Sequence, residues 1–358
     1  MVAPRHSVCS NIHIAQEIST HQDDAIMVRW RTVASRAPCD PPGMTTSHAN
    51  ALLALGHYLR EHGYRFMTVT PSTHRRINRR DGNDLAGDLR GIFGWSRPFR
   101  EADVDPRVVE LMREARILER DGELWRSTLR ASTLPVYHDE LLVFHSAYPT
   151  IDDDSVFFGP DTYRFVGTMA RAFPWLGAGP SRAIDIGCGG GAGALAIARA
   201  FPHAEVVGAD INTRALALSI VNARLAGLGN FTAARSDLFD GVEGDFDLIV
   251  SNPPYVLDPA ELPYRHGGGM HGAELSVRIV KESLARLRRG GNLMLYTGVS
   301  IGGAKDQFLE AIRPQLDALC DQWSYDELDP DIFGGQLGEP GYEEVERIAA
   351  VWLHAIRR

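Results

Sequence analysis

The loop at residues 251–255, Ser-Asn-Pro-Pro-Tyr, follows the apolar run Phe246–Val250 and carries residue types suited to chemistry. Neither proline has a backbone N–H, and both rings hold φ near about −65°, so the loop is stiff and presents carbonyl oxygens as acceptors. Asn252 adds a side-chain oxygen, and Tyr255 adds a flat ring with a polar tip. Such a loop fits a planar nitrogen with two N–H donors, for example a carboxamide or an exocyclic amino group. The alternative is an ordinary turn after a strand.

A second candidate site is the glycine-rich run at residues 185–193, Asp-Ile-Gly-Cys-Gly-Gly-Gly-Ala-Gly. It lies between a predicted strand and a predicted helix, where glycines let the backbone turn tightly and approach a ligand. Gly187, Gly189 and Ala192 also satisfy a dinucleotide fingerprint, which makes an NAD-dependent oxidoreductase an alternative. Three features favour another cofactor. Asp185 lies where it can meet a cofactor amine, the Asn-Pro-Pro-Tyr loop has no use in hydride transfer, and no His or Lys is placed as a proton donor for hydride chemistry.

Two further acidic residues follow predicted strands. Asp210 ends the second strand and is suited to accept hydrogen bonds from two ribose hydroxyls, or to cap the helix that begins at Thr213. Asp237 and Leu238 follow the third strand, where the carboxylate can take an adenine amino proton and the leucine can pack on the ring. An ordinary polar end of a strand explains Asp237 equally well.

The second half of the chain alternates short apolar strands with helices. This pattern predicts a parallel sheet covered on both faces, with ligands outside the carboxyl ends of the strands. Asp185, Asp210 and Asn252 would then meet at one rim. The predicted strands are 182–186, 205–209, 231–234, 246–250, 292–297, 323–328 and 348–354, and the predicted helices are 163–173, 191–201, 213–225 and 275–287.

The composition is that of a soluble globular protein, with 44% hydrophobic and 23% charged residues in 358. No apolar run approaches the roughly 20 residues that cross a bilayer, and the N-terminus lacks a compact apolar block, so we expect a cytoplasmic protein. The four cysteines are scattered without Cys-x-x-Cys spacing, so we expect no metal site and no disulfide framework. The oligomeric state is open.

The net charge of −9 is unevenly distributed. Residues 1–100 carry 13 Arg and 8 acidic residues, a charge of +5, whereas the remainder is acidic. An acidic body does not attract phosphate backbones in general. The cluster 74–80, His-Arg-Arg-Ile-Asn-Arg-Arg, is the local exception, and we interpret it as a solvated charge run rather than a nucleic-acid contact.

The chain divides into three predicted parts. Residues 1–43 are expected to be poorly ordered, residues 44–150 to form a smaller helical domain, and residues 151–358 to form the α/β domain. In the middle part, a helix at 49–62, a second that starts at Asp105-Pro106 and a hairpin that turns on Asp121-Gly122 resemble a winged-helix module. For this module we favour a role in packing or in substrate selection. The alternative is a nucleic-acid-binding regulator with a base-modifying or a vestigial catalytic domain.

Taken in this order, the glycine run, the two strand-end acids and the Asn-Pro-Pro-Tyr loop resemble the class I S-adenosylmethionine-dependent methyltransferases. Within them the chain is most similar to release-factor glutamine methyltransferases and their rRNA and adenine-N6 relatives. The segment 159–162, Gly-Pro-Asp-Thr, is similar to the one that precedes the catalytic domain in that group. The resemblance implies a Rossmann-like, seven-stranded, mostly parallel sheet with an antiparallel last strand.

The resemblance implies transfer of a methyl group from S-adenosylmethionine, with S-adenosylhomocysteine as product. The implied catalytic residues are Asn252, Pro253, Pro254 and Tyr255, which would hold the target nitrogen. The implied cofactor-binding residues are Asp185, Gly187, Cys188, Gly189, Gly190, Gly191, Asp210, Ile211, Asp237, Leu238 and Asn252. Candidate substrate contacts are Phe158, Asp161, Tyr163 and His271. The methyl acceptor can be a protein, an RNA or a small molecule.

Overall fold

The structure is a computed structural model that describes residues 44–258 and 261–358. The expectation that residues 1–43 are poorly ordered concerns residues outside these ranges. All described residues belong to one compact unit.

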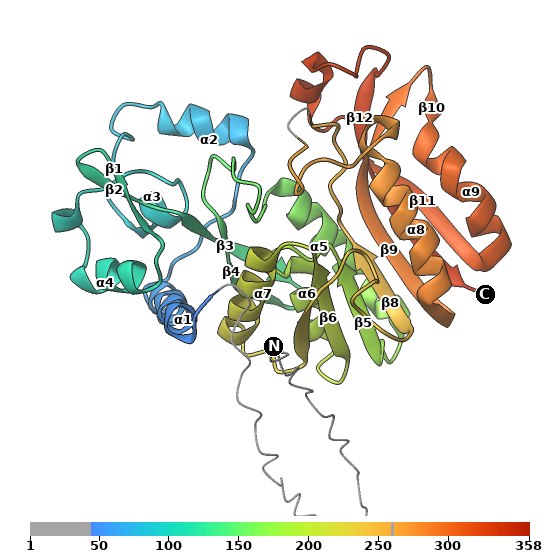
Figure 1. The fold of residues 1–358 in the computed structure, drawn as a ribbon, viewed down its shortest axis with the longest axis horizontal. Coiled ribbons are helices and arrows are strands. Elements are labelled where there is room, and N and C mark those ends of the chain that lie inside the picture. Colours follow the sequence, from blue (N-terminus) through green and yellow to red (C-terminus); the bar gives the residue numbers. More distant parts are fainter. Residues whose placement is uncertain (1–43, 259–260) are drawn as a thin grey trace, which may run out of the picture. The chain divides into compact units, whose positions relative to one another are not determined.

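The second half of the chain forms the predicted sheet, in the order β11-β12-β9-β8-β5-β6-β7 (Figure 1). Neighbours from β7 to β9 are parallel, and β12 is antiparallel to both β9 and β11. The seven-stranded, mostly parallel sheet with an antiparallel last strand is therefore confirmed; a two-residue strand, β10, pairs with β9 as an unpredicted eighth. The strands are β5 (Arg182–Ile186), β6 (Glu205–Asp210), β7 (Phe231–Arg235), β8 (Phe246–Ser251), β9 (Leu287–Gly302), β10 (Lys305–Asp306), β11 (Cys320–Asp329) and β12 (Arg347–Arg357).

Helices cover both faces of this sheet. Leu248 and Val250 of β8 pack with residues of α5 and α6, whereas Ile249 packs with residues of α8 and α9. This alternation is why the strands read as continuous apolar runs. The helices are α5 (Pro160–Ala172), α6 (Ala192–Ala200), α7 (Thr213–Leu225), α8 (Glu274–Arg286) and α9 (Gln307–Leu319), with short 3₁₀ turns at Phe173–Leu176, Met270–Gly272 and Gly334–Gly338. The predicted helices are confirmed to within a few residues, and α9 was not predicted.

The region before α5 contains short helices and two hairpins. Helix α1, the start of α4 after the Asp105 cap and the β1–β2 hairpin agree with the sequence prediction. Helix α2 and the β3–β4 hairpin were not predicted. The elements are α1 (Thr46–Glu61), α2 (Pro71–Asn78), α3 (Leu89–Phe93), a 3₁₀ turn at Glu101–Asp103, α4 (Pro106–Glu114), β1 (Leu118–Asp121), β2 (Leu124–Ser127), β3 (Leu129–Val136) and β4 (Asp139–Ser146).

The N-terminal elements share cores with the sheet domain. Leu218 and Leu225 of α7 pack among the buried residues of α1 and α4, while Leu134 and Val143 of the β3–β4 hairpin pack with α5 and α6. The Asn222 side chain of α7 also accepts from the Phe144 N–H at 2.8 Å. The boundary at residue 150 and the winged-helix interpretation stay predictions.

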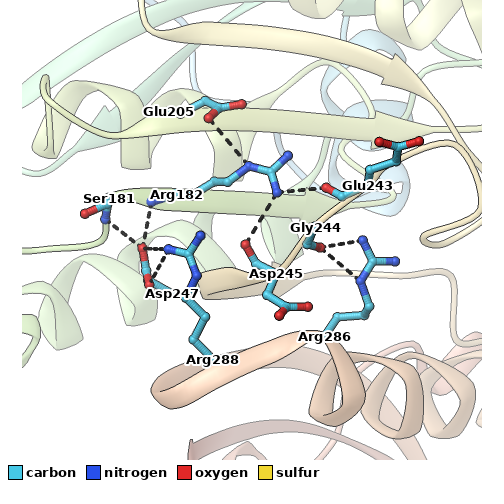
Figure 2. Close-up of polar contacts among 9 residues, drawn as sticks. All are labelled: Ser181, Arg182, Glu205, Glu243, Gly244, Asp245, Asp247, Arg286 and Arg288. Carbon is cyan, nitrogen blue, oxygen red and sulfur yellow. Dashed lines mark hydrogen bonds and ion pairs between the residues drawn. The ribbon is translucent and has the colours of Figure 1, made fainter. Parts of the chain in front are cut away.

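A polar cluster joins the amino ends of the central strands (Figure 2). The Asp247 carboxylate of β8 accepts from the backbone N–H groups of Ser181 and Arg182 at 3.0 and 2.9 Å, and from Arg288 of β9 at 2.9 Å. The Arg182 guanidinium donates to the Glu243 carbonyl at 2.8 Å. These bonds tie β5, β8 and β9 at the end of the sheet opposite the candidate site, so they help to fix the register that places the site residues.

Candidate functional site

The carboxyl ends of four strands meet at one rim. Ile186, the last residue of β5, lies opposite Ser251 of β8 and Ala209 of β6. On the other side of β6, Asp210 lies opposite Arg235 of β7. The loops that leave these strands carry the glycine run, the two strand-end acids and the Asn-Pro-Pro-Tyr segment, so the register gathers the predicted site residues at one edge.

The glycine run forms a tight turn between β5 and α6. Gly187 and Gly189 have φ values of +68° and +53°, in the left-handed region that favours glycine. A Cβ at either position would meet no other atom within 4 Å, so the backbone borders open space there. The N–H groups of Gly187 and Cys188 both donate to the Ala209 carbonyl, which holds the turn against β6. The Cys188 side chain is buried, and Gly190 and Gly191 complete the turn before α6.

Asp185 lies beneath this turn. Its side chain is 2% exposed, and its Oδ2 accepts from the Ala194 N–H at 2.9 Å in the first turn of α6. A Cβ on Gly193 would lie 2.7 Å from Oδ2, so the helix approaches the carboxylate closely because residue 193 is glycine. Burial raises the pKa of Asp185 to about 7, against the opposing effect of the Ala194 N–H. The structure thus gives Asp185 a supporting position under the turn, and its contact with a cofactor amine stays a prediction.

Asp185→Asn is expected to stabilise the protein at alkaline pH. Because the pKa in the folded protein lies above the unfolded value of 3.8, the folded state binds more protons between these values, and stability falls as pH rises through this window. Asparagine retains an oxygen for the Ala194 N–H and cannot ionise. The difference in unfolding free energy between variant and wild type should grow from about pH 4 to pH 7 and then level off, at a few kcal/mol. Urea unfolding across this range measures it, and a difference that stays constant with pH would contradict a raised pKa of Asp185 in the folded protein.

Asp210 lies at the edge of the turn. It is half-buried, and its carboxylate accepts from the N–H groups of Gly189 at 2.8 Å and Asn212 at 2.9 Å. Burial raises its pKa, and these N–H groups oppose that shift. The helix cap of α7 is the Asn212 side chain, so the alternative role of Asp210 as that cap is wrong. Ile211 beside it is 53% exposed, which leaves an apolar side chain uncovered next to the turn.

The loop after β7 turns at Leu238, whose φ is +46°. The Leu238 side chain is buried, and the Ser236 hydroxyl donates to its carbonyl at 2.8 Å. The Asp237 side chain is 63% exposed and lies 4.0 Å from Arg278. Asp237 is therefore open to solvent at the rim, and its predicted hydrogen bond to an adenine amino group stays a prediction.

The Asn-Pro-Pro-Tyr loop leaves β8 beside the glycine turn. The Ser251 hydroxyl donates to the Ile186 carbonyl at 2.7 Å, which ties the end of β8 to the residue before Gly187. Asn252 is half-buried, and Pro253 is buried. Within residues 44–258 and 261–358, nothing donates a hydrogen bond to the Asn252 side-chain oxygen or to the Pro253 carbonyl. Both acceptors therefore keep their hydrogen-bonding capacity within the described chain.

Tyr255 lies next to a buried polar network that includes Tyr296 and Asp161. Its ring is 8% exposed and packs edge-on against Tyr296 and Phe333. Burial and then the nearby Asp161 carboxylate raise the pKa of Tyr255. A Cβ on Gly298 would lie 2.3 Å from the ring, so glycine at that position leaves room for it. The predicted stacking of this ring on a substrate stays a prediction, since the structure shows its contacts with the protein only.

Asp161 is the centre of that network. It is 3% exposed, accepts from the Tyr296 hydroxyl at 2.6 Å and pairs with Arg164 at 3.0 Å, and Arg164 also contacts Asp329 at 2.9 Å. Asp161 is thus engaged by Tyr296 and Arg164 beside Tyr255, and its predicted contact with substrate stays a prediction. The sequence reasoning missed Tyr296, Arg164 and Asp329. The signal that could have found Tyr296 is its position at the end of a predicted strand next to the rim.

Tyr296→Phe tests this network. It removes an O–H donor to a buried carboxylate, so we expect a loss of about 1.5–3 kcal/mol in unfolding free energy. Denaturant unfolding measures this loss. Tyr137→Phe is the matched control, because Tyr137 is half-buried and its hydroxyl makes no hydrogen bond within the described ranges. Equal stabilities of the two variants would show that the Tyr296–Asp161 bond contributes nothing.

The other predicted substrate contacts lie in different surroundings. The buried Phe158 ring stacks on His145 at 4.8 Å and meets the Tyr163 ring edge-on at 5.2 Å. The Tyr163 hydroxyl accepts from the Thr68 N–H at 2.9 Å, so it joins α5 to the N-terminal elements. His271 follows the Asn-Pro-Pro-Tyr loop in a left-handed conformation, and its ring lies 6.4 Å from that of Tyr342. Their contacts with substrate stay predictions.

Comparison with known proteins finds relatives of this chain among methyltransferases. Residues 172–313 match the family profile described as "Methyltransferase small domain". The chain is 35% identical over 156 residues to the ribosomal protein uL3 glutamine methyltransferase of Xanthomonas campestris pv. campestris, covering 40% of this chain and 49% of the relative. It is 37% identical over 141 residues to the release factor glutamine methyltransferase of Rhodopirellula baltica, covering 36% and 48%. The chain thus spans about half the length of the curated relatives it matches.

A solved structure of the T. thermophilus 16S rRNA N2 G1207 methyltransferase, in complex with AdoMet and guanosine, aligns with a TM-score of 0.43 at 19% identity, covering 73% of this chain and 64% of that one. The resemblance predicted from the sequence is confirmed: residues 172–313 match a methyltransferase domain, and the curated relatives include glutamine methyltransferases. No helix in the described ranges is long and apolar enough to span a membrane.

Proposed function

We propose that this chain, which carries a methyltransferase domain, transfers the methyl group of S-adenosylmethionine to the amide nitrogen of a glutamine side chain in a protein. One observation carries the proposal: Ile186 and Ser251 are partners in adjacent parallel strands, so the glycine turn and the Asn-Pro-Pro-Tyr loop begin side by side. A methyl donor on the turn and an amide on the loop would then be neighbours, and positioning of this kind can supply most of the rate enhancement of a direct displacement.

The residues at the rim fit the cofactor. The backbone at Gly187 and Gly189 borders open space, and the half-buried Asp210 carboxylate can accept from ribose hydroxyls. The exposed Ile211 offers an apolar surface beside Asp210 for the adenine ring. When bound, S-adenosylmethionine supplies a methyl group activated by the sulfonium charge. Cofactor binding by Cys188, Gly190, Gly191, Asp237 and Leu238 is proposed on the same ground, their place at the rim.

The loop supplies the acceptors that orient the amide. The two N–H groups of a carboxamide donate to the Asn252 side-chain oxygen and the Pro253 carbonyl, the two acceptors that no described residue occupies. The nitrogen attacks the methyl carbon; the N–C bond forms as the S–C bond breaks, and the electron pair of that bond goes to sulfur. The nitrogen then loses a proton to water. The same two oxygens stabilise the positive charge that develops on nitrogen in the transition state.

The relatives favour a protein amide as the acceptor. Both of those named above are glutamine methyltransferases, one for ribosomal protein uL3 and one for release factors. A glutamine of a protein of the translation machinery is accordingly the proposed substrate, and a cytoplasmic location goes with it. A planar nucleobase amine would satisfy the same two acceptors, so RNA is the competing acceptor that the experiment must distinguish.

Labelled S-adenosylmethionine and a fractionated cell extract test the proposal. The purified protein should transfer the label to a protein, and hydrolysis of that protein should release N5-methylglutamine. Asn50→Ala, a change on the exposed side of α1, serves as the matched active control. Label in RNA or in small molecules, with none in protein, would refute the protein amide as acceptor.

A further inference from the structure

Arg130 of β3 is a buried cation without a counter-ion. The residue is 4% exposed, and its Nε and Nη2 atoms make no hydrogen bond. No carboxylate of the described ranges lies within 4.0 Å of it. Burial lowers the pKa of Arg130 to about 10, and the group is still charged at neutral pH. Buried charges are normally paired, so an unpaired guanidinium indicates a missing partner.

The unsatisfied atoms lie on one edge of the guanidinium. Nε and Nη2 present two parallel N–H donors, the arrangement that binds two oxygens of one phosphate or carboxylate. Among the described residues, the cation–ring contact of Arg130 is with Phe66, whose ring centre lies 5.5 Å from the Arg130 Cζ. An aromatic face attracts the cation and leaves these in-plane donors free.

His74 of α2 is a second buried group, with one unpartnered ring nitrogen and a backbone hydrogen bond to Trp95. It is 4% exposed, and its Nε2 makes no hydrogen bond within the described chain. The ring lies 4.5 Å from that of Tyr148 and 5.7 Å from that of Trp95. Burial lowers the pKa of His74 to about 4, and the nearby Arg130 charge lowers it further. The sequence interpretation of residues 74–80 as a solvated run is therefore wrong at His74.

The surroundings add positive charge. The charges of Arg97 and Arg75 also lower the pKa of His74, so both lie near it. The Asp88 charge raises the pKa of Arg97. The Asp88 carboxylate, however, already accepts from the Gly91 N–H at 2.7 Å as the cap of α3. The exposed arginines of α2 and its end have no carboxylate within 4.0 Å in the described ranges; they are Arg75, Arg76, Arg79 and Arg80.

We propose that Arg130 and His74 form a binding site for a phosphate group beneath α2, bordered by the arginines of that helix. Arg130 would donate to two phosphate oxygens through Nε and Nη2, and the neutral His74 ring, in the tautomer with its proton on Nε2, would donate to a third. A phosphate has enough oxygens for all three donors, and its double charge balances more of the surrounding positive charge than one carboxylate does.

Helix α2 can admit such a ligand. His74 is its only buried residue, so few contacts hold the helix down. The bonds that retain it run from Arg75 to the Tyr148 hydroxyl at 2.9 Å and from Asn78 to the Trp95 carbonyl at 2.8 Å. In addition, Arg97 donates to the Asn78 side chain at 2.9 Å and Asn83 donates to the Ile77 carbonyl at 2.7 Å. An outward shift of α2 would break the bonds to Tyr148 and Trp95 and uncover His74. The site does not depend on the proposed methyl transfer.

Thermal unfolding of the full chain in inorganic phosphate tests the proposal. At equal ionic strength, phosphate should raise Tm by a few degrees more than chloride or acetate. Arg130→Met should abolish this extra rise and, without phosphate, should have a Tm equal to or above that of wild type, because an apolar chain of similar length replaces an unpaired buried charge. Arg289→Met, which removes an exposed arginine of β9, should retain the rise.

Two outcomes would overturn the site: no extra rise for the wild type, or an undiminished rise in Arg130→Met. An equal rise in acetate would overturn phosphate as the ligand. Should Arg130→Met fail to fold, His74→Gln replaces it, and retention of the full rise in Tm in that variant counts against the site.

A labelled short single-stranded RNA distinguishes the two possible sources of the phosphate. RNA binding that weakens in Arg75→Gln/Arg76→Gln indicates a nucleic-acid phosphate, and a phosphate response without RNA binding indicates a free small phosphate.

Discussion

Replacement of Asn252 by alanine should lower kcat for methyl transfer by about 10²–10³-fold while the Kd for S-adenosylmethionine changes by no more than a few-fold. The Asn252 oxygen is one of two acceptors proposed to hold the target amide, and its interaction strengthens as positive charge develops on nitrogen. The backbone route of the loop is set by Ser251 and the two prolines, which the substitution leaves in place. Single-turnover kinetics with saturating cofactor measure the chemical step, and calorimetry measures cofactor binding.

Asn50→Ala provides the control for this experiment. Asn50 is exposed on α1 and accepts only from Arg224, at 3.0 Å, within the described ranges. The kcat of the Asn50→Ala variant should equal that of the wild type. A wild-type rate in Asn252→Ala would show that the side-chain oxygen does not hold the amide, and a large loss of cofactor affinity would assign Asn252 to cofactor binding instead.

The second large effect is expected for Asp210→Ala, which should weaken S-adenosylmethionine binding by about 10²-fold. Hydrogen bonds to a carboxylate contribute about 1.5–3 kcal/mol each, and Asp210 is proposed to accept two from the ribose. The substitution also removes the acceptor for the Gly189 N–H and so loosens the turn. Isothermal titration with S-adenosylhomocysteine measures the change without turnover.

Asp240→Ala is the matched control, since Asp240 is exposed in the loop after β7 and its replacement removes the same charge. The affinity of this variant for S-adenosylhomocysteine should remain at the wild-type value. Equal affinities of Asp210→Ala and wild type would mean that the ribose lies elsewhere. Unchanged binding together with a lost rate would place Asp210 in the chemical step rather than in cofactor recognition.

Sequence periodicity predicted the sheet domain well because its strands and helices alternate and are punctuated by glycine and proline. The strand ends Asp185, Asp210 and Asn252 could be grouped from the sequence alone, since parallel strands share one carboxyl edge. Helix-capping residues also marked where helices begin: α4 starts after the Asp105 cap, as predicted. Helix α5 starts at Pro160, three residues before the prediction, because its backbone cap is Gly159 rather than a polar side chain.

The elements that were missed depend on contacts between distant segments. The β3–β4 hairpin contains Arg130, Ser132 and His145, which break the apolar pattern of a strand, and Ser132 and His145 hydrogen-bond to each other at 2.8 Å only once the two strands pair. Tyr296 and Asp161 are 135 residues apart and meet only through the packing of α5 on the sheet. Pairing of this kind leaves no local signal in composition or period.

The proposed chemistry requires one geometry above all, in which a carboxamide bound to the Asn-Pro-Pro-Tyr loop lies against a cofactor on the glycine turn. A crystal structure with S-adenosylhomocysteine and a glutamine-containing acceptor peptide measures this directly. We expect the amide nitrogen within hydrogen-bond distance of both the Asn252 oxygen and the Pro253 carbonyl, and facing the cofactor sulfur. A sulfur bound away from Gly187–Gly191, or an amide held by other residues, would contradict this mechanism.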